Sequence, residues 1–288
     1  MKVLVTSSTG LTGKAVVKGL ARNGVEVRAM LHSSARASEM HALGAKETVI
    51  GEIELRRDLV RSMEGMDSVY YIAPTAREDE AEIGKMAIEA AKEAGIKRFI
   101  YQSVLHSIEP GLPHHRQILE VERALIDSGL EYSIVQPAPF MQNILNSKDA
   151  LLNNKVFVQK FFINKESSNR INLIDVEDFG ESVAEIVCNP RYIYSTLELC
   201  GPQNLSVTDI LSSLEGVTGE KIDLRCISDE EIMNGMRAKG AAEYSVETLL
   251  EMFHHYNNGD FCGSLFISEA ILRRKPTTFY DFLKREIK

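Results

Sequence analysis

The first half of the chain alternates between two spacings of apolar residues. Short runs rich in β-branched and aromatic residues predict strands over residues 2–6, 25–31, 47–50, 68–72, 97–103 and 131–137. Amphipathic stretches of helical period lie between them, and the two clearest end at Gly24 and Gly95, a usual residue behind a last helical turn. Each linking segment is long enough for a crossover helix. The pattern therefore predicts a parallel sheet with helices on both faces.

The regular alternation stops after Pro137. An apolar run over residues 156–163 is followed by a helical pattern that starts behind Asp175, which we expect to cap that helix. From about residue 200 onward, short strand and helix patterns mix without a βαβ rhythm. The second half is therefore expected to belong to a different structural class from the first half.

These patterns predict two parts. The first is a Rossmann-type doubly wound parallel α/β domain over residues 1–155. The second is a smaller C-terminal α+β lobe over residues 156–288, with parts of 170–200 expected to return to the first domain. The lobe should pack at the carboxyl edge of the sheet, where open α/β sheets bind their ligands.

Charge and hydropathy narrow the possible partners. The 288 residues carry a formal net charge of −8, and no apolar run approaches the roughly 20 residues of a membrane-spanning helix. An acidic chain without a Lys/Arg stripe also repels the phosphate backbone of nucleic acids. The first residues do not resemble a secretion signal. We expect a cytoplasmic monomer or homodimer that binds neither membranes nor nucleic acid directly.

The four cysteines are widely spaced, with no CxxC pair and no neighbouring histidine pattern. This spacing argues against a zinc site and against a disulfide framework. We therefore expect no metal site, and we expect buried thiols at Cys188, Cys200, Cys226 and Cys262.

The stretch VTSSTGLTG at residues 5–13 follows the first predicted strand and opens a helix. This is the context in which dinucleotide pyrophosphates bind, because the first amides of a helix lack intrahelical partners. Gly10 would let a phosphate approach the backbone, and Gly13 would let the helix pack closely on the strand. Ser7 replaces the usual first glycine, and a serine can make this turn if its φ stays negative. The expected cofactor-binding residues are Thr6, Ser7, Ser8, Thr9, Gly10, Leu11, Thr12 and Gly13; an ordinary polar turn is the alternative.

The loop and several later segments resemble the NmrA-like branch of the atypical short-chain dehydrogenase/reductases. The fingerprint of that family is TGATGxxG, from which this chain departs at Ser7 and Ser8. Further similar segments are VRAMLHSSARA, KRFIYQSVLH, VERALIDSGLEYSIVQPAPFMQNI and RRKPTTFYDFLKREI. Together they cover most of the chain. The resemblance implies a Rossmann fold that binds a nicotinamide dinucleotide.

The end of the second strand indicates which dinucleotide is preferred. Rossmann domains that bind NAD carry an acid there, which binds the ribose hydroxyls. This chain instead has His32, followed by two serines and Arg36, so a 2′-phosphate would meet donors and a positive charge. We expect NADP(H) to be preferred and NAD(H) to be possible. The alternative is that Arg36 is a solvated residue at the start of a helix.

Two further turns should line the cofactor. VIGEIE resembles the family's turn beside the adenine, which places Glu52 and Ile53 near that ring. YIAPT follows the fourth strand, so Ala73 and Pro74 are expected near the pyrophosphate and the inner ribose. Ser103, behind the fifth strand, is expected at the same edge.

The catalytic Tyr-x-x-x-Lys pair of related enzymes is missing, because His114 and Ile118 stand at those positions. The remaining catalytic candidates are Ser103, His106, His114 and His115. Histidine can exchange protons near neutral pH, although these three are more often loop or surface residues. Phe140, Met141 and Asn143 are expected to line a substrate pocket, with a core or structural position as the alternative.

Two functions of different class remain. The first is a reductase that passes hydride from NADPH to a quinone-like or other electron-poor small acceptor. The second is a non-catalytic NAD(P)(H) sensor that acts through a regulatory protein partner. The missing tyrosine and lysine are compatible with both. We favour the reductase because an apolar second lobe over the nicotinamide end would form a pocket that a sensor needs less.

Overall fold

The computed structural model describes residues 1–160 and 168–287. The described chain divides into two compact units. The first unit consists of Met1–Pro137 and Val176–Leu199, and the second of Ala138–Asp175 and Cys200–Lys288. The chain therefore leaves the first unit after residue 137 and returns to it for one helix and one strand.

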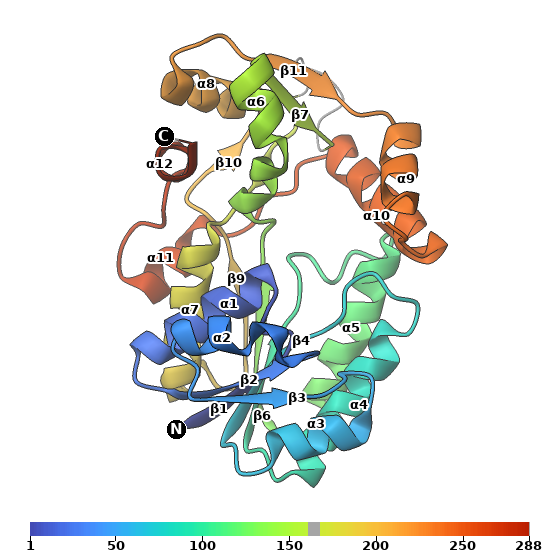
Figure 1. Ribbon diagram of the computed structural model, residues 1–288, viewed down its shortest axis with the longest axis vertical. Coiled ribbons are helices and arrows are strands. Elements are labelled where there is room, and N and C mark those ends of the chain that lie inside the picture. Colours follow the sequence, from blue (N-terminus) through green and yellow to red (C-terminus); the bar gives the residue numbers. More distant parts are fainter. Residues whose placement is uncertain (161–167, 288) are drawn as a thin grey trace. The chain divides into compact units, whose positions relative to one another are not determined.

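A seven-stranded parallel sheet forms the centre of the first unit (Figure 1). Its strands are β1 (Lys2–Val5), β2 (Glu26–Leu31), β3 (Glu47–Ile50), β4 (Ser68–Ile72), β5 (Arg98–Gln102), β6 (Glu131–Pro137) and β9 (Ser195–Leu199). The order across the sheet is β3-β2-β1-β4-β5-β6-β9, so the direction of winding reverses between β1 and β4. The predicted doubly wound parallel sheet is confirmed.

Helices cover both faces of this sheet (Figure 1). They are α1 (Leu11–Arg22), α2 (Ala37–Ala42), α3 (Arg56–Met63), α4 (Glu80–Glu93), α5 (Pro113–Ile126) and α7 (Val176–Cys188), with short 3₁₀ turns η1 (Ser34–Arg36) and η3 (Pro190–Tyr192). Helices α3, α4 and α5 pack beside one another on one face, and α1 packs on α7. The central strands are buried on both sides, and Val69, Tyr70 and Tyr71 of β4 have no exposed surface, whereas the edge strand β3 is partly exposed.

Helices α1 and α7 cross at glycines that leave no room for a side chain. A Cβ added at Gly180 would lie 2.5 Å from the carbonyl oxygen of Ala15, and one added at Gly19 would meet the carbonyl oxygen of Gly180. At this crossing the two backbones are therefore in direct contact. The close approach sets the position of α1 on the sheet.

The second unit mixes short strands and helices. Its strands are β7 (Val156–Gln159), β8 (Ile171–Asn172), β10 (Asn204–Leu205) and β11 (Asp223–Cys226). Its helices are α6 (Lys148–Asn154), α8 (Val207–Thr218), α9 (Asp229–Arg237), α10 (Glu243–Asn258), α11 (Leu265–Leu272) and α12 (Phe279–Ile287), with the 3₁₀ segment η2 (Met141–Ser147). β7 pairs with β11 in parallel and β8 with β10 antiparallel. Of the expected apolar run 156–163, residues 161–163 lie outside the described residues.

An ion pair between the buried Asp175 and the partly exposed Arg285 joins distant parts of the second unit. The carboxylate of Asp175 has no exposed surface and accepts hydrogen bonds from Arg285, at 2.7 Å, and from Gln142, also at 2.7 Å. The hydrogen bond to Asp175, and after it the one to Glu286, raise the pKa of Arg285. Asp175 directly precedes α7 in the chain. Its carboxylate also ties α12 to the end of β8.

The cysteines differ from the expectation of buried thiols. No disulfide joins the four, all of which lie in the described ranges. Only Cys200 is buried, whereas Cys188 is exposed and Cys226 and Cys262 are partly exposed. Cys188 is exposed because it ends α7, past the last turn that faces the sheet. Within residues 1–160 and 168–287, no helix has the length and apolarity needed to span a membrane.

Replacing Gly180 with valine should destabilise the first unit. The added side chain would overlap backbone atoms of α1, which cannot move without shifting the sheet, so we expect a loss of roughly 1–3 kcal/mol or more in the free energy of unfolding. Urea denaturation followed by circular dichroism measures this loss. Gly235→Ala in α9 is the control, because its added Cβ meets no atom within 4 Å. Equal midpoints for wild type and Gly180→Val would contradict the close crossing.

Candidate dinucleotide site

The turn behind β1 lies where the winding of the sheet reverses. In doubly wound sheets, a crevice opens at this point beyond the carboxyl ends of the strands. Thr6 is buried and fixes the turn to β4, since its hydroxyl donates to the carbonyl oxygen of Ile72 at 3.1 Å and accepts from the Ile72 amide at 2.8 Å. The buried Ser8 hydroxyl donates to the carbonyl oxygen of Met30 at 2.7 Å. The turn is therefore held to both neighbouring strands.

Ser7 adopts a conformation that the sequence analysis did not expect. Its φ is 45°, in the left-handed region, whereas a negative φ was expected. A non-glycine residue costs on the order of 1–3 kcal/mol there. The Ser7 hydroxyl donates to the carbonyl oxygen of Ile72 at 3.1 Å, which offsets part of that cost. The turn requires a left-handed conformation at position 7, which glycine adopts easily. Here Ser7 adopts it, and the Ser7 hydroxyl donates a hydrogen bond to the backbone.

The start of α1 is open for an anion. No side chain caps this helix end, and no acidic residue occupies its first turn. The amides of Leu11, Thr12 and Gly13 therefore lack both an intrahelical acceptor and a carboxylate in front of them. Gly13 is required by packing, because a Cβ there would lie 2.5 Å from the carbonyl oxygen of Ser7. Gly10 is exposed and its Cβ would meet only that same oxygen, at 3.3 Å.

The turn behind β2 gathers charges of both signs. Arg36 donates to Glu39 at 2.7 Å, and the other oxygen of Glu39 lies 2.6 Å from the ammonium of Lys14 in the first turns of α1. These two cations, Lys14 first, lower the pKa of Glu39. His32 is bonded to Glu52 at 2.8 Å. Both side chains that were expected to meet a phosphate, Arg36 and His32, are thus bonded to a carboxylate.

The remaining cofactor candidates lie near the same sheet edge. Ala73 and Pro74 directly follow β4 and are partly exposed. Ile53 follows the turn after β3 and, with Ala73, packs against the apolar cluster under α3 and α4. An apolar surface at Ile53 suits contact with an aromatic ring, and it also fits the core.

Ser103 belongs to a buried polar network behind β5. Its hydroxyl donates to the carboxylate of Glu122 in α5, and only 2% of Ser103 is exposed. Glu122 also accepts from Gln136 at 2.8 Å, and Gln136 donates to Ser107 at 2.9 Å. Because the single hydroxyl proton of Ser103 is directed to Glu122, its lone pairs are what it can offer a ligand. Ser103 is arranged as a hydrogen-bond acceptor.

Two of the three candidate histidines, His114 and His115, are buried in a helix, whereas a surface or loop position is more usual for histidine. His114 and His115 lie in the first turn of α5 and are 5% and 1% exposed. His114 is bonded to the buried Glu80 carboxylate at 3.0 Å, and His115 to the carbonyl oxygen of His106 at 2.7 Å. Pro113 starts the helix, and both rings lie on the face that carries the buried Ile118. His106 is partly exposed with a φ of 57°.

Two buried tyrosines lie in the same core. The hydroxyls of Tyr71 and Tyr101 have no hydrogen-bond partner among the described residues. Burial raises the pKa of both hydroxyls far above the usual value, and the charge of Glu80 adds to the effect. Both are therefore poor proton donors.

The expected substrate-pocket residues lie in the second unit. Phe140 precedes η2 and bridges to Ile174, while the Met141 amide donates to the carbonyl oxygen of Ile174 at 2.9 Å. Met141 is buried and Asn143 is exposed. The described residues contain no cluster of His, Cys, Asp or Glu suited to a metal ion.

Sequence reasoning missed three acids with roles in this arrangement. Glu39 stands three residues after Arg36, a spacing that pairs opposite charges along one helical turn and could have revealed it. Glu122 belongs to the VERAL segment, where it received no role. Glu80 had no signal, because its partner His114 is 34 residues away.

The fold and the uncapped helix define the class of this protein as a Rossmann-type dinucleotide-binding fold. A family model describes residues 1–283 as the NmrA-like family. The chain therefore belongs to the NmrA-like family, and the resemblance predicted from its motifs is confirmed.

Relatives of known activity match nearly the whole chain. The NAD(P)H azoreductase of Xenophilus azovorans is 25% identical over 284 residues, which cover 98% of this chain and 96% of that protein. Among solved structures, the NADPH-dependent quinone oxidoreductase of Escherichia coli in complex with NADPH superposes with a TM-score of 0.84. The two sequences are 20% identical, and the superposition covers 99% of this chain and 100% of the oxidoreductase chain. NmrA, a negative transcriptional regulator in complex with NADP, reaches a TM-score of 0.78 at 18% identity. This superposition covers 99% of this chain and 95% of the NmrA chain.

Glu122→Ala should destabilise the protein because it leaves Ser103 without its buried acceptor and removes one of the two acceptors of Gln136. We expect a loss of about 1–3 kcal/mol in the free energy of unfolding. Glu122→Gln is the matched control, since its amide oxygen can still accept from Ser103 and should retain more of the stability. Thermal or urea unfolding measures both variants. If Glu122→Ala were as stable as wild type, the network would not stabilise the sheet edge.

Proposed function

We propose that this protein is an NADPH-dependent reductase of quinone-like or other electron-poor small acceptors. The observation that carries the proposal is the uncapped, acid-free start of α1 at the reversal point of the sheet. Full-length similarity to an azoreductase and to a quinone oxidoreductase supports the choice of reaction. In this proposal the acceptor is a small molecule and the protein acts in the cytoplasm as a monomer or homodimer.

The start of α1 would hold the pyrophosphate. The amides of Leu11, Thr12 and Gly13 are donors without intrahelical acceptors, at the positive end of the helix dipole. Gly10 leaves the approach to them open, because it carries no side chain and lies exposed. Thr6, Ser7 and Ser8 would act indirectly, since their hydroxyls hold the turn to β4 and β2. Thr9 is the fourth polar side chain of this turn.

Arg36 and His32 would bind the 2′-phosphate that distinguishes NADP(H) from NAD(H). Both are paired with acids in this structure, Arg36 with Glu39 and His32 with Glu52. If Arg36 turns from Glu39 to the phosphate, the negative charge of Glu39 is still partly neutralised, because the Lys14 ammonium lies 2.6 Å from its carboxylate. Its negative charge nevertheless opposes a phosphate nearby. We therefore infer that Glu39 weakens the preference for NADP(H) that Arg36 creates.

The rest of the dinucleotide would extend along the carboxyl edge of the sheet. Ile53 and Glu52 would lie beside the adenine, and Ala73 and Pro74 beside the pyrophosphate and inner ribose. Ser103 would accept a hydrogen bond from a donor such as a hydroxyl or a carboxamide. Phe140, Met141 and Asn143 would contribute to the acceptor pocket. NAD(H) would bind in the same way, with lower affinity.

The residues at the expected proton-donor positions restrict which acceptors the protein could reduce. When bound, NADPH supplies a hydride. Ile118 is buried and cannot exchange a proton, while Ser103 directs its proton to Glu122 and His114 is bonded to Glu80. A ketone needs a positioned donor as its oxygen becomes an alkoxide. A quinone does not, because its reduced anion is stabilised by its own ring and can take a proton from water.

A sensing function is the second candidate. It is favoured by the similarity to NmrA, a negative transcriptional regulator in complex with NADP, and the missing tyrosine and lysine at positions 114 and 118 are compatible with it. In that case the dinucleotide would alter a surface recognised by a regulatory protein partner. Tight NADPH binding without turnover of any acceptor would support it over the reductase.

Arg36→Ala should reduce the affinity for NADPH by roughly tenfold or more and leave that for NADH little changed, because a charged contact to phosphate is lost. Glu39→Gln should act in the opposite direction and increase the ratio of NADPH to NADH affinity severalfold, since the acid beside Arg36 is neutralised. Calorimetric titration of the three proteins with both dinucleotides measures the ratio. Equal losses for both dinucleotides in Arg36→Ala would contradict a 2′-phosphate contact.

The acceptor range tests the reaction itself. We expect NADPH oxidation with a quinone and none above background with an aliphatic ketone, followed as the loss of NADPH absorbance. His114→Gln should leave quinone turnover within about threefold of wild type if that histidine is structural. Efficient ketone reduction, abolished in His114→Gln, would show that His114 supplies the missing proton.

A further inference from the structure

The last residue of β5, Gln102, carries an amide that has no role in the dinucleotide site proposed above. Gln102 is partly exposed at the carboxyl end of its strand. The hydroxyl of Tyr70, in the neighbouring strand β4, donates to the side-chain oxygen Oε1 of Gln102 at 3.1 Å. The side-chain nitrogen Nε2 has no hydrogen-bond partner among the described residues. Gln102 therefore has two N–H donors available at the edge of the sheet.

The buried phenol of Tyr70 fixes which end of this amide is available. Tyr70 has no exposed surface, and burial raises the pKa of its hydroxyl well above the ordinary value, so the phenol keeps its proton. Among the described residues, that proton has no acceptor other than Oε1 of Gln102. If the amide were turned over, a buried donor would lose its acceptor, which would raise the free energy of the folded protein. Oε1 therefore stays on Tyr70, and Nε2 faces away from it.

Gln102 lies on the same face of the sheet as α1. Residues four apart in a strand share a face, so Gln102 is on the face of Arg98. The Arg98 guanidinium donates to the carbonyl oxygen of Ile186 in α7 at 2.9 Å, and α1 packs on α7. The start of α1, where we propose that the pyrophosphate binds, is therefore on the side of the sheet that Gln102 faces.

The spacing of the strands indicates which part of a dinucleotide would reach Gln102. Gln102 pairs with Ile72 of β4 in the register of the sheet. The carbonyl oxygen of Ile72 accepts hydrogen bonds from Thr6 and Ser7 in the turn behind β1. Neighbouring strands are about 4.8 Å apart, so Gln102 is about 10 Å across the sheet from that turn. One ribose and the nicotinamide ring cover such a distance from the pyrophosphate, and the adenine half would extend the other way, toward β2 and β3.

We propose that Gln102 binds the nicotinamide half of the dinucleotide by donating from Nε2 to the carboxamide oxygen of the ring, and that Tyr70 is the positioning residue that holds the amide in this orientation. The carboxamide oxygen only accepts hydrogen bonds, so it needs the donor end of the Gln102 amide. A ribose hydroxyl pairs with either end of an amide and would gain nothing from the fixed orientation. The inference rests on the proposed function, because it requires a dinucleotide at the start of α1.

Calorimetric titration of the full chain with NADP⁺ and with 2′-phospho-ADP-ribose, which lacks the nicotinamide ring, tests the contact. Gln102→Met keeps the length of the side chain and removes its donors. We expect it to reduce the affinity for NADP⁺ about three- to tenfold, the effect of one neutral hydrogen bond, and to leave the affinity for 2′-phospho-ADP-ribose unchanged. The thionicotinamide analogue of NADP⁺ should lose clearly less affinity than NADP⁺, because its sulfur is a weak acceptor.

Tyr70→Phe tests the positioning role. Without the phenol the Gln102 amide can turn over, so we expect the affinity for NADP⁺ to fall, but by less than in Gln102→Met. In the Gln102→Met background the same change should have no further effect on NADP⁺ affinity, because Tyr70 then has no amide to hold. Equal losses in both backgrounds would show a purely structural role and would overturn the positioning by Tyr70.

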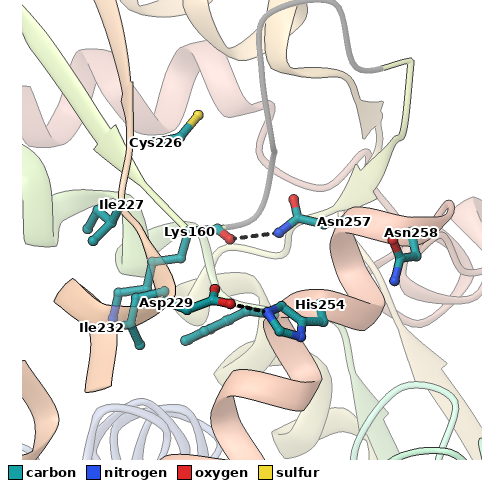
Figure 2. A pocket seen from close by; sticks show the side chains of 9 residues that line it. Lys160, Cys226, Ile227, Asp229, Ile232, His254, Asn257 and Asn258 are labelled. Carbon is teal, nitrogen blue, oxygen red and sulfur yellow. Dashed lines mark hydrogen bonds and ion pairs between the residues drawn. The ribbon is translucent and has the colours of Figure 1, made fainter. Parts of the chain in front are cut away.

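Asn258→Leu is the control for the loss of an amide. Asn258 ends α10 in the second unit, where it lines a cavity that has no part in the proposed dinucleotide site (Figure 2). The affinities of this variant for both ligands should equal those of wild type. If the wild type bound neither ligand, the proposed function would fail together with this inference. If it bound both, undiminished NADP⁺ affinity in Gln102→Met, or an equal loss for 2′-phospho-ADP-ribose, would overturn this inference alone.

Discussion

The close approach of α1 to the turn behind β1 is the constraint on which the candidate site depends. Gly13 lies against the backbone of Ser7 and Ser8 with no room for a Cβ, and Gly180 brings α7 into backbone contact with the other side of α1. Together they fix the uncapped start of α1 at the reversal point of the sheet. The amides that we propose bind the pyrophosphate are therefore positioned by packing.

Charge compensation is the second physical feature of the site. Arg36 and His32, which we propose bind the 2′-phosphate, are bonded to Glu39 and Glu52, and the buried Glu122 accepts hydrogen bonds from Ser103 and Gln136. Such pairing gives these charged and polar groups hydrogen-bond partners before a ligand binds. A buried charge without a partner would raise the free energy of the folded protein. It also means that binding exchanges one set of partners for another. The affinity for a phosphate is reduced by the bonds that must first break.

Much of the fold could be predicted from the sequence, because local periodicity determines strands and helices directly. All six predicted strands are present, and the glycines that end α1 and α4 lie where the pattern put them. The left-handed Ser7 was missed because the chain around it, rather than serine itself, imposes that conformation. The inward turn of His114 and His115 and the pairing of His114 with Glu80 depend on contacts between helices far apart in sequence. Such contacts leave no local pattern.

The most direct test of the account is a backbone amide NMR spectrum of the isotope-labelled protein during titration with NADPH. The central claim is that the start of α1 binds the pyrophosphate of the dinucleotide. We expect the largest changes in amide proton shift at Leu11, Thr12 and Gly13, because these amides would gain charged acceptors. Changes confined to residues 138–175 and 200–287, with the amides of residues 7–13 unmoved at saturation, would contradict the account.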